Sequence, residues 1–235
     1  MELKLDAWSQ NDYEQFIEYL KSVSDDDYKK FSDSLVPGIN HSFGVRVPIL
    51  RNIAKEILKG NYSDFLSLKK GSSREEIMVE GLVMAGIKCG YDELLSLIKE
   101  YTEKIDSWET CDIVSFKQIK KYLKEFFNDI EYFIYNDNPW AVRYGFGCLM
   151  EFYLNDEYID RVFEYVNSVN SDFYYVQMMQ GWLIATAAAK CRDKTLKFLE
   201  NNRLNDITQN MAIRKMRESR RISKEDKEFI LRFKR

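Results

Sequence analysis

Signals that begin a helix recur along this chain at a nearly constant interval. Ser73 and Glu76 have the pattern of a capping box, and Asn138 before Pro139 combines an N-cap residue with proline in the first helical position. The expected starts are Ser73, Ser107, Asn138, Asp172 and Asp206. Successive starts are therefore 34, 31, 34 and 34 residues apart. A period of this length with two helices per unit is typical of an α-solenoid.

The rest of the chain agrees with a helical fold. Second helices are expected between the starts, for example over residues 157–169 and 193–201, and only three prolines interrupt the 235 residues. The early part is less regular, with helices expected over 9–21 and 25–35, a turn at Pro37-Gly38 and a helix that begins at Pro48. No Gly/Ser/Pro-rich linker divides the chain. The sequence therefore predicts a single all-α domain over residues 1–235, an α-solenoid of antiparallel helix pairs.

Several kinds of chemistry find no support in the sequence. With one histidine, His41, and four widely spaced cysteines, a zinc site built from Cys and His is not expected. Reduced, buried thiols in a cytosolic protein are the better interpretation. The first residues lack a signal-peptide pattern, and no apolar run approaches the length that spans a membrane. We expect a cytoplasmic protein without metal, organic cofactor or membrane association.

Charge is unevenly distributed. Residues 211–235 contain ten Lys or Arg against four Asp or Glu, so this segment has a charge of +6. Because the net charge of the chain is −3, the other residues together have a charge of −9. The net charge argues against indiscriminate nucleic-acid binding. A basic end on an acidic body is expected of a protein that contacts phosphate with one surface. A solvated terminal helix is the alternative interpretation.

Four side chains are the candidates for chemistry. Trp108 and Asp112 are four apart, so a helix would place the indole and the carboxylate one turn apart on one face. Arg143 and Trp182 each lie in a segment expected to be the first helix of a pair. If the pairs stack, the four residues reach one surface that suits a cationic, sugar-bearing substrate. Without further support, Trp108 and Trp182 would be core residues and Arg143 a surface salt-bridge partner.

The same segments resemble a known family. Residues 43–55, FGVRVPILRNIAK, resemble the entry motif of the AlkD-type DNA alkylation repair proteins. The segments around Trp108 and Asp112, around Arg143 and around Trp182 resemble that family's later motifs, in the same order. The resemblance runs from about residue 15 to about residue 225. It implies a monomeric α-solenoid of HEAT-like antiparallel helix pairs, curved around double-stranded DNA and nucleoid-associated when bound to it.

The resemblance also implies an activity. Catalytic members are DNA glycosylases of base excision repair that release cationic N-alkylated purines, such as 3-methyladenine and 7-methylguanine, from duplex DNA. They do so without flipping the base, unlike most enzymes that act on bases. Asp112 matches the catalytic aspartate, Trp108 and Trp182 match the two indoles that cradle the deoxyribose, and Arg143 matches the arginine beside the aspartate. No cofactor is implied.

Basic residues near both ends of the resemblance are candidates for contacts with the DNA backbone. Those near the start of the Pro48 helix could act with its free N–H groups, which favour phosphate. Such contacts set the register of the protein on DNA without reading its sequence. The candidates are Arg46, Arg51, Lys55, Arg214, Lys215, Arg217, Arg220 and Arg221.

Three positions depart from the family's pattern. Ser107 stands where a second tryptophan is common, Ala185 where the glycosylases have arginine, and Asn210 where a basic residue is expected. Since some relatives bind DNA without excising a base, three interpretations remain open. The protein is a glycosylase, a non-catalytic relative that binds damaged or branched DNA, or a helical protein-binding scaffold. DNA binding that weakens steeply with salt would exclude the scaffold.

Overall fold

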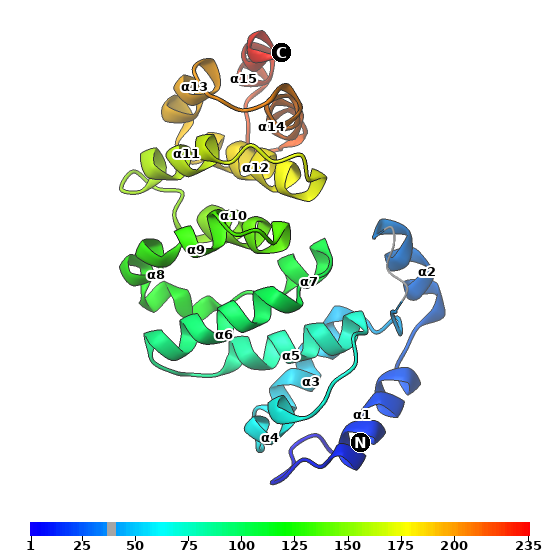
Figure 1. Ribbon diagram of the computed structural model, residues 1–235. Coiled ribbons are helices and arrows are strands. Elements are labelled where there is room, and N and C mark those ends of the chain that lie inside the picture. The colour runs from blue at the N-terminus through cyan, green and yellow to red at the C-terminus, as the bar shows by residue number, and fades with distance from the viewer. Residues whose placement is uncertain (37–40) are drawn as a thin grey trace. The chain divides into compact units, whose positions relative to one another are not determined.

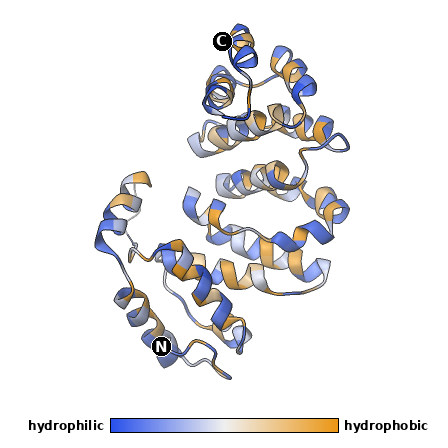
Figure 2. Cartoon of the chain, turned by 180° about the vertical axis from the view of Figure 1, so that it is seen from behind, coloured by the Kyte–Doolittle hydropathy of each residue, from blue (hydrophilic) through white to orange (hydrophobic). Residues whose placement is uncertain are grey.

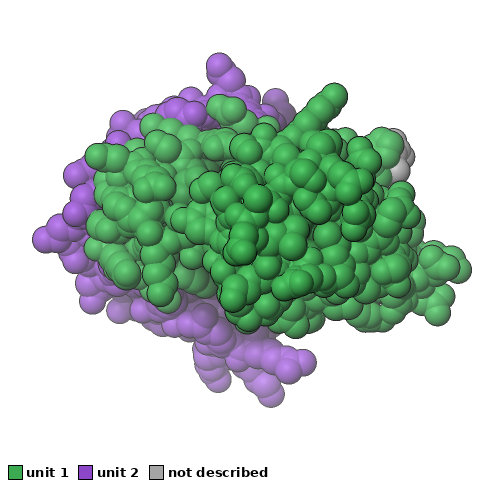
Figure 3. All heavy atoms as spheres, turned by 90° about the horizontal axis from the view of Figure 1, so that it is seen from below, with its two compact units in different colours: residues 1–122 green, residues 123–235 purple. Residues whose placement is uncertain are grey.

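The computed structural model describes residues 1–36 and 41–235, so the turn expected at Pro37-Gly38 lies outside the described residues. Within the described ranges every regular element is a helix and there is no β-strand, which confirms the predicted all-α class. The chain divides into two compact units, residues 1–122 and 123–235, coloured separately in Figure 3. Each unit is described by itself below. The single domain over 1–235 and its continuous solenoid stay predictions.

Unit 1 is organised around one central helix. Its helices are α1 (Gln10–Ser22), α2 (Asp26–Leu35), α3 (Val47–Ile57), α4 (Tyr62–Ser67), α5 (Arg74–Gly86), α6 (Tyr91–Lys104), α7 (Trp108–Ile113) and the 3₁₀-helix η1 (Lys117–Lys121). Helix α5 packs against α3, α6 and α7 (Figure 1). Gly81 lets α6 approach closely, since a Cβ there would lie 2.2 Å from the Tyr101 ring. The position of α7 therefore depends on α5.

The first turn of α5 is charged and yet buried. Ser73 and Glu76 form the predicted capping box, in which the Ser73 N–H donates to the Glu76 carboxylate and the Glu76 N–H donates to Ser73 Oγ. Arg74, Glu75 and Glu76 are at most 7% exposed. Buried charges of this kind are tolerated only when hydrogen bonds or opposite charges compensate them.

Glu75 is compensated by the loop that precedes α3. Its carboxylate accepts hydrogen bonds from the backbone N–H groups of Phe43, Gly44 and Val45, at 2.9, 2.8 and 3.1 Å. Gly44 has a φ of +88°, and a Cβ there would lie 2.5 Å from the Lys29 Cβ, so this turn requires glycine. The contact ties the loop firmly to α5.

The core of unit 1 lies among α1, α3, α4 and α5. Trp8 and Phe16 pack edge-to-face against Phe65, with ring centroids 5.1 and 5.7 Å apart. Leu20 and Ile57 are fully buried in the same cluster. Figure 2 shows hydrophobic and hydrophilic residues alternating along most helices, as expected for amphipathic helices that bury one side.

Unit 2 consists largely of stacked helix pairs. Its helices are α8 (Leu123–Asp129), α9 (Glu131–Ile134), α10 (Pro139–Phe152), α11 (Ile159–Ser168), α12 (Tyr174–Ala188), α13 (Arg192–Glu200), α14 (Asp206–Glu218), α15 (Lys224–Phe229) and the 3₁₀-helix η2 (Ile230–Phe233). Helix α12 packs between α10 and α14, and α11 packs on α13 (Figure 1). The first helices of successive pairs therefore lie side by side within this unit.

The expected helix starts agree with the structure to within one or two residues. Ser73, Ser107 and Asn138 are N-caps, as predicted. Helix α12 begins at Tyr174 instead of near Asp172, because Ser171 Oγ accepts the Phe173 N–H and closes the preceding turn. Asn205 caps α14 one residue before the predicted start, since its side chain accepts the Thr208 N–H at 2.8 Å.

We predict that replacing Glu75 with alanine destabilises unit 1 strongly. The Glu75→Ala change leaves three backbone N–H groups and Arg74 without the carboxylate that they contact, so the free energy of unfolding should fall by about 3–5 kcal/mol. Urea unfolding followed by circular dichroism measures this. The exposed Glu103 on α6 provides the control, and Glu103→Ala should stay within about 0.5 kcal/mol of the wild type. Equal stability of the two variants would contradict the prediction.

Candidate functional site

Helix α7 carries the first two candidates. It spans Trp108–Ile113, so Trp108 and Asp112 lie one turn apart on one helix, as predicted. A capping box begins the helix, in which the Ser107 side chain accepts the Thr110 N–H and Thr110 Oγ1 accepts the Ser107 N–H at 3.2 Å. Tyr101 Oη adds a hydrogen bond of 2.6 Å to the Thr110 carbonyl. This short helix is thus held by contacts in addition to its own backbone hydrogen bonds.

Helix α7 is also anchored by a buried ion pair. Glu109 is 5% exposed and its Oε2 lies 2.8 Å from Arg74 Nη1 of α5. Ser32 Oγ of α2 donates to Glu109 Oε1 at 2.8 Å and accepts from Arg74 Nη1 at 2.9 Å. Three helices therefore meet at one polar cluster. Because each partner is hydrogen-bonded, the cluster fixes the rotation of α7.

Trp108 and Asp112 differ in how they are held. The Trp108 indole N–H donates to the Leu35 carbonyl at the end of α2, 3.1 Å away, and the side chain is half-buried. Asp112 is also half-buried, in the last turn of α7. Cys111 between them is 4% exposed, which agrees with its interpretation as a packing residue. Since its N–H is engaged, Trp108 offers a ligand the face of its ring.

Arg143 is buried in unit 2. It lies on α10, is 3% exposed, and its Nη1 donates to the Tyr175 carbonyl in the first turn of α12 at 2.7 Å. The Trp140 ring packs on Phe173 and Tyr175 beside this contact, with centroids 5.2 and 5.1 Å away. Arg143 therefore ties α10 to the start of α12, which a surface salt-bridge partner would not do.

Trp182 is exposed and not a core residue. Its side chain on α12 is 45% exposed, whereas its neighbour Gly181 is buried. A Cβ on Gly181 would lie 3.2 Å from the Ala212 backbone nitrogen and 3.2 Å from the Met211 Cβ, so α14 passes very close here. The indole of this candidate residue is therefore accessible to a ligand.

A shallow depression lies beside Trp182. Its volume is about 260 Å³, and it is bounded by one side of α12 and the end of α14. The lining residues are Trp182, Ala185, Thr186, Ala189, Lys215, Glu218, Ser219 and Arg221. Lys215 and Arg221 thus bring cations to the surface next to Ala185, where the sequence lacks the arginine expected from the resemblance. This proximity could not be predicted from the sequence, because it depends on the packing of α12 against α14.

The four candidates fall into two pairs. Trp108 and Asp112 lie in unit 1, and Arg143 and Trp182 lie in unit 2. The structure describes each pair within its own unit. The expectation that all four form one surface therefore stays a prediction.

The basic candidates of unit 1 differ in their partners. Arg46 is engaged with Asp25, at 3.0 and 2.7 Å, and its guanidinium lies 4.9 Å from the Tyr28 ring centroid. Hydrogen bonds from the Tyr28 N–H and from Arg46 lower the pKa of Asp25. Arg51 and Lys55 are exposed one turn apart on α3 and, within the described residues, form no ion pair. These two are the more available cations.

The basic candidates of unit 2 lie on α14 and just after it. Glu218 forms ion pairs with Arg214 at 3.5 Å and with Lys215 at 2.9 Å. The hydrogen bond from Lys215 is the main reason why the pKa of Glu218 is lowered. The other three candidates form no ion pair in the part of the chain that the structure describes. They are Arg217, Arg220 and Arg221.

The described residues show neither a cluster of metal-binding side chains nor a membrane-spanning helix. Among residues 1–36 and 41–235, no group of three or more His, Cys, Asp and Glu side chains is placed to hold a metal ion. In the same ranges, no helix combines the length and apolar character needed to cross a membrane. The cytoplasmic location and the monomeric state stay predictions.

Comparison with known proteins places the chain in a family. A comparison with curated proteins found no matching sequence. The chain does match the family described as DNA alkylation repair enzyme over residues 16–216, a range that contains all four candidates. This match covers most of the 235 residues and confirms the resemblance stated above. The chain belongs to the DNA alkylation repair enzyme family, and its role is in DNA repair.

Proposed function

We propose that the protein is a DNA glycosylase that releases cationic N-alkylated purines, such as 3-methyladenine and 7-methylguanine, from duplex DNA without base flipping. The proposal rests mainly on the contacts that hold α7 in place. This helix presents an indole and a carboxylate one turn apart, while Glu109 of the same helix is locked to Arg74. Groups held in place before the substrate binds stabilise developing charge most effectively.

The leaving group simplifies the chemistry. A purine alkylated at a ring nitrogen is already cationic, so it departs with the electron pair of the C1′–N bond and becomes neutral without a general acid. The sugar gains positive charge as this bond breaks. A carboxylate beside C1′ stabilises that charge and accepts a proton from the water whose oxygen bonds to C1′. Asp112 has this role in our proposal, and one carboxylate suffices, unlike the pair used by most glycosidases.

The indoles would contact the sugar. Because the Trp108 N–H is bound to the Leu35 carbonyl, a ligand meets the π face of the ring. Trp182 is 45% exposed and offers a second indole. A cation over an aromatic face gains about 0.5–2 kcal/mol, and the gain grows as the sugar becomes charged. We propose that Trp108 and Trp182, each within its own unit, offer an aromatic face to a deoxyribose of bound DNA.

Cations near Trp182 support binding of the DNA backbone. Lys215 and Arg221 line the depression that also contains Ala185, so α14 and the residues after it can supply the charge that position 185 lacks. Arg143 is buried and bound to the Tyr175 carbonyl, which favours a positioning role at the start of α12 over a bidentate phosphate contact. In unit 1, Arg51 and Lys55 are the candidates for phosphate contacts.

A non-catalytic DNA-binding protein is the second candidate. Ala185 in place of arginine and the charge of −9 outside residues 211–235 favour weaker binding of DNA at the site. This candidate predicts salt-sensitive DNA binding without release of any base, so one assay separates it from the glycosylase.

We predict that Asp112→Asn removes most of the base release. Duplex DNA treated with a methylating agent is incubated with each protein, and free 7-methylguanine and 3-methyladenine are measured by mass spectrometry. The variant should be slower by about 10²–10³-fold, because one preorganised charge is lost. Binding to the same duplex should persist, since Asp112 does not attract phosphate.

The matched control is Asp92→Asn, which makes the same chemical change at an exposed position in the first turn of α6. It should release bases at the wild-type rate. No release by the wild type, with salt-sensitive DNA binding intact, would replace the glycosylase by the binding protein. Equal rates for wild type and Asp112→Asn would remove Asp112 from the mechanism.

We further predict that Glu218→Gln strengthens DNA binding. Glu218 neutralises both Arg214 and Lys215, so its loss frees two cations on α14, of which Lys215 lines the depression beside Trp182. Affinity for undamaged duplex DNA should rise several-fold, and the dependence of log K on log salt should steepen by about 0.9 for each cation that gains a phosphate. Fluorescence anisotropy over a potassium chloride series measures both quantities.

Glu200→Gln on α13 is the control for charge alone, because Glu200 is exposed and does not line the depression beside Trp182. It should change the slope little. If both variants behave alike, net charge and not the Lys215 region governs binding.

A further inference from the structure

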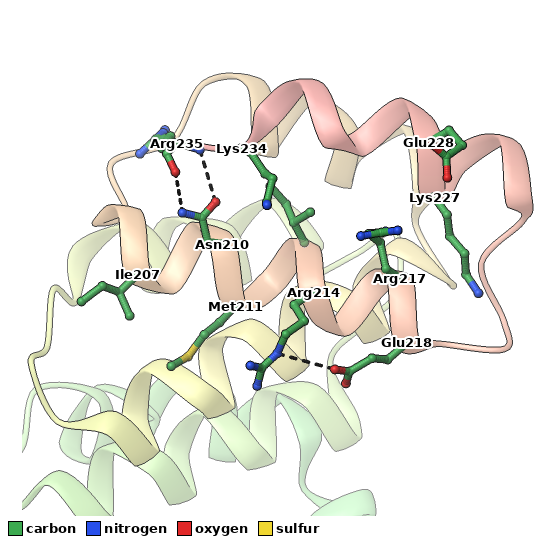
Figure 4. A pocket seen from close by; sticks show the side chains of 11 residues that line it. Ile207, Asn210, Met211, Arg214, Arg217, Glu218, Lys227, Glu228, Lys234 and Arg235 are labelled. Atoms are coloured by element: carbon green, nitrogen blue, oxygen red, sulfur yellow. Dashed lines mark hydrogen bonds and ion pairs between the residues drawn. The ribbon is translucent and has the colours of Figure 1, made fainter.

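A second and larger depression lies on a neighbouring side of α14. Its volume is about 840 Å³, and its walls are α14, α15 and the last residues of the chain (Figure 4). The lining residues are Ile207, Asn210, Met211, Ile213, Arg214, Arg217, Glu218, Lys227, Glu228, Lys234 and Arg235. We call this the α14–tail depression. Several of its residues, among them Asn210, Lys227 and Lys234, have no part in the site described above.

Asn210 holds the last residues of the chain against α14. Its Nδ2 donates to the Arg235 carbonyl at 2.6 Å, and its Oδ1 accepts the Arg235 N–H at 3.2 Å. Gln209 adds a hydrogen bond from Nε2 to the Phe233 carbonyl at 3.0 Å. Lys234 lies between these two anchored residues, and Figure 4 shows its side chain directed toward α14. The amide at position 210 therefore positions a cation although it carries no charge.

The α14–tail depression has an excess of positive charge. Five of its lining residues are Lys or Arg and two are Glu. Glu218 is already engaged by Arg214 and Lys215. In the ranges that the structure describes, Arg217, Lys227 and Lys234 form no ion pair. An anionic ligand would therefore meet three cations that form no ion pair with the described residues.

The position of the depression indicates which anion. It shares Glu218 with the depression beside Trp182, so the two lie on neighbouring sides of α14. Packed helices are about 8–10 Å apart, and each strand of a duplex presents a phosphate every ~3.4 Å along its axis. A strand that passes Trp182 thus has a phosphate in reach within about three nucleotides. Ile207 and Met211 give the apolar lining that a deoxyribose can pack on.

We propose that the α14–tail depression binds a backbone phosphate of duplex DNA beyond Trp182, through Arg217, Lys227 and Lys234, and that Asn210 is a positioning residue for Lys234. This inference depends on the DNA binding in the proposed function but not on base release. The family resemblance leads us to expect a cation at position 210. In this proposal Lys234 supplies that cation, and Asn210 holds the end of the chain that carries Lys234.

The test measures the salt dependence of binding to an undamaged duplex of about 20 base pairs. Arg217→Gln and Lys234→Gln should each lower the slope of log K against log salt by about 0.9, the value for one phosphate contact. Lys197→Gln removes the same charge from an exposed position on α13 and should leave the slope unchanged. Slopes for Arg217→Gln and Lys234→Gln equal to that of Lys197→Gln would overturn the proposal.

Asn210→Ala tests the positioning role without changing any charge. Its slope should match that of Lys234→Gln, and the double variant should show no further loss, because both changes remove the same contact. A lower melting temperature with the wild-type slope would mean that Asn210 only stabilises the fold. If the slopes change as expected but no base is released from methylated DNA, the phosphate site stands and the glycosylase does not.

Discussion

The carboxylate of Glu75, sealed from solvent and bound to three consecutive backbone N–H groups, is the contact on which unit 1 depends. The adjacent Arg74 lies 3.4 Å from this carboxylate and joins α2 and α7 through Ser32 and Glu109. Two neighbouring charges at one helix start therefore connect four segments far apart in sequence. Because a buried charge without its partner is costly, these segments are held in one arrangement.

The two units hold their candidate residues by different physical means. In unit 1, polar contacts set the rotation of α7, and with it the directions of Trp108 and Asp112. In unit 2, packing does the same work, since the absence of a side chain at Gly181 brings α14 next to Trp182. The polar contacts set the direction in which the side chains of α7 point, and the close packing sets the distance between α12 and α14. Functional side chains need both kinds of support to be held in place.

What the sequence revealed about this protein was local or came from the family resemblance. Ser73, Ser107 and Asn138 cap helices through residues two or three positions away, so their roles were readable from the chain alone. The pairing of Glu109 with Arg74 spans 35 positions and has no local pattern. The exposure of Trp182 depends on where α14 packs. From the sequence, Asn210 showed only the absence of an expected basic residue. Its contact with Arg235 could not be predicted, because the two residues are 25 positions apart.

Gly181 has a consequence for anyone who engineers this protein. Glycine in the middle of a helix costs about 1 kcal/mol relative to alanine, so α12 is an attractive target for raising heat resistance. Here the added methyl group would meet the backbone of α14 at 3.2 Å, closer than ordinary contact. Replacing Gly181 with alanine to gain helix propensity would thus increase the distance between α12 and α14. Designs that seek a hardier protein should modify α11 or α13 first, whose exposed residues face neither depression.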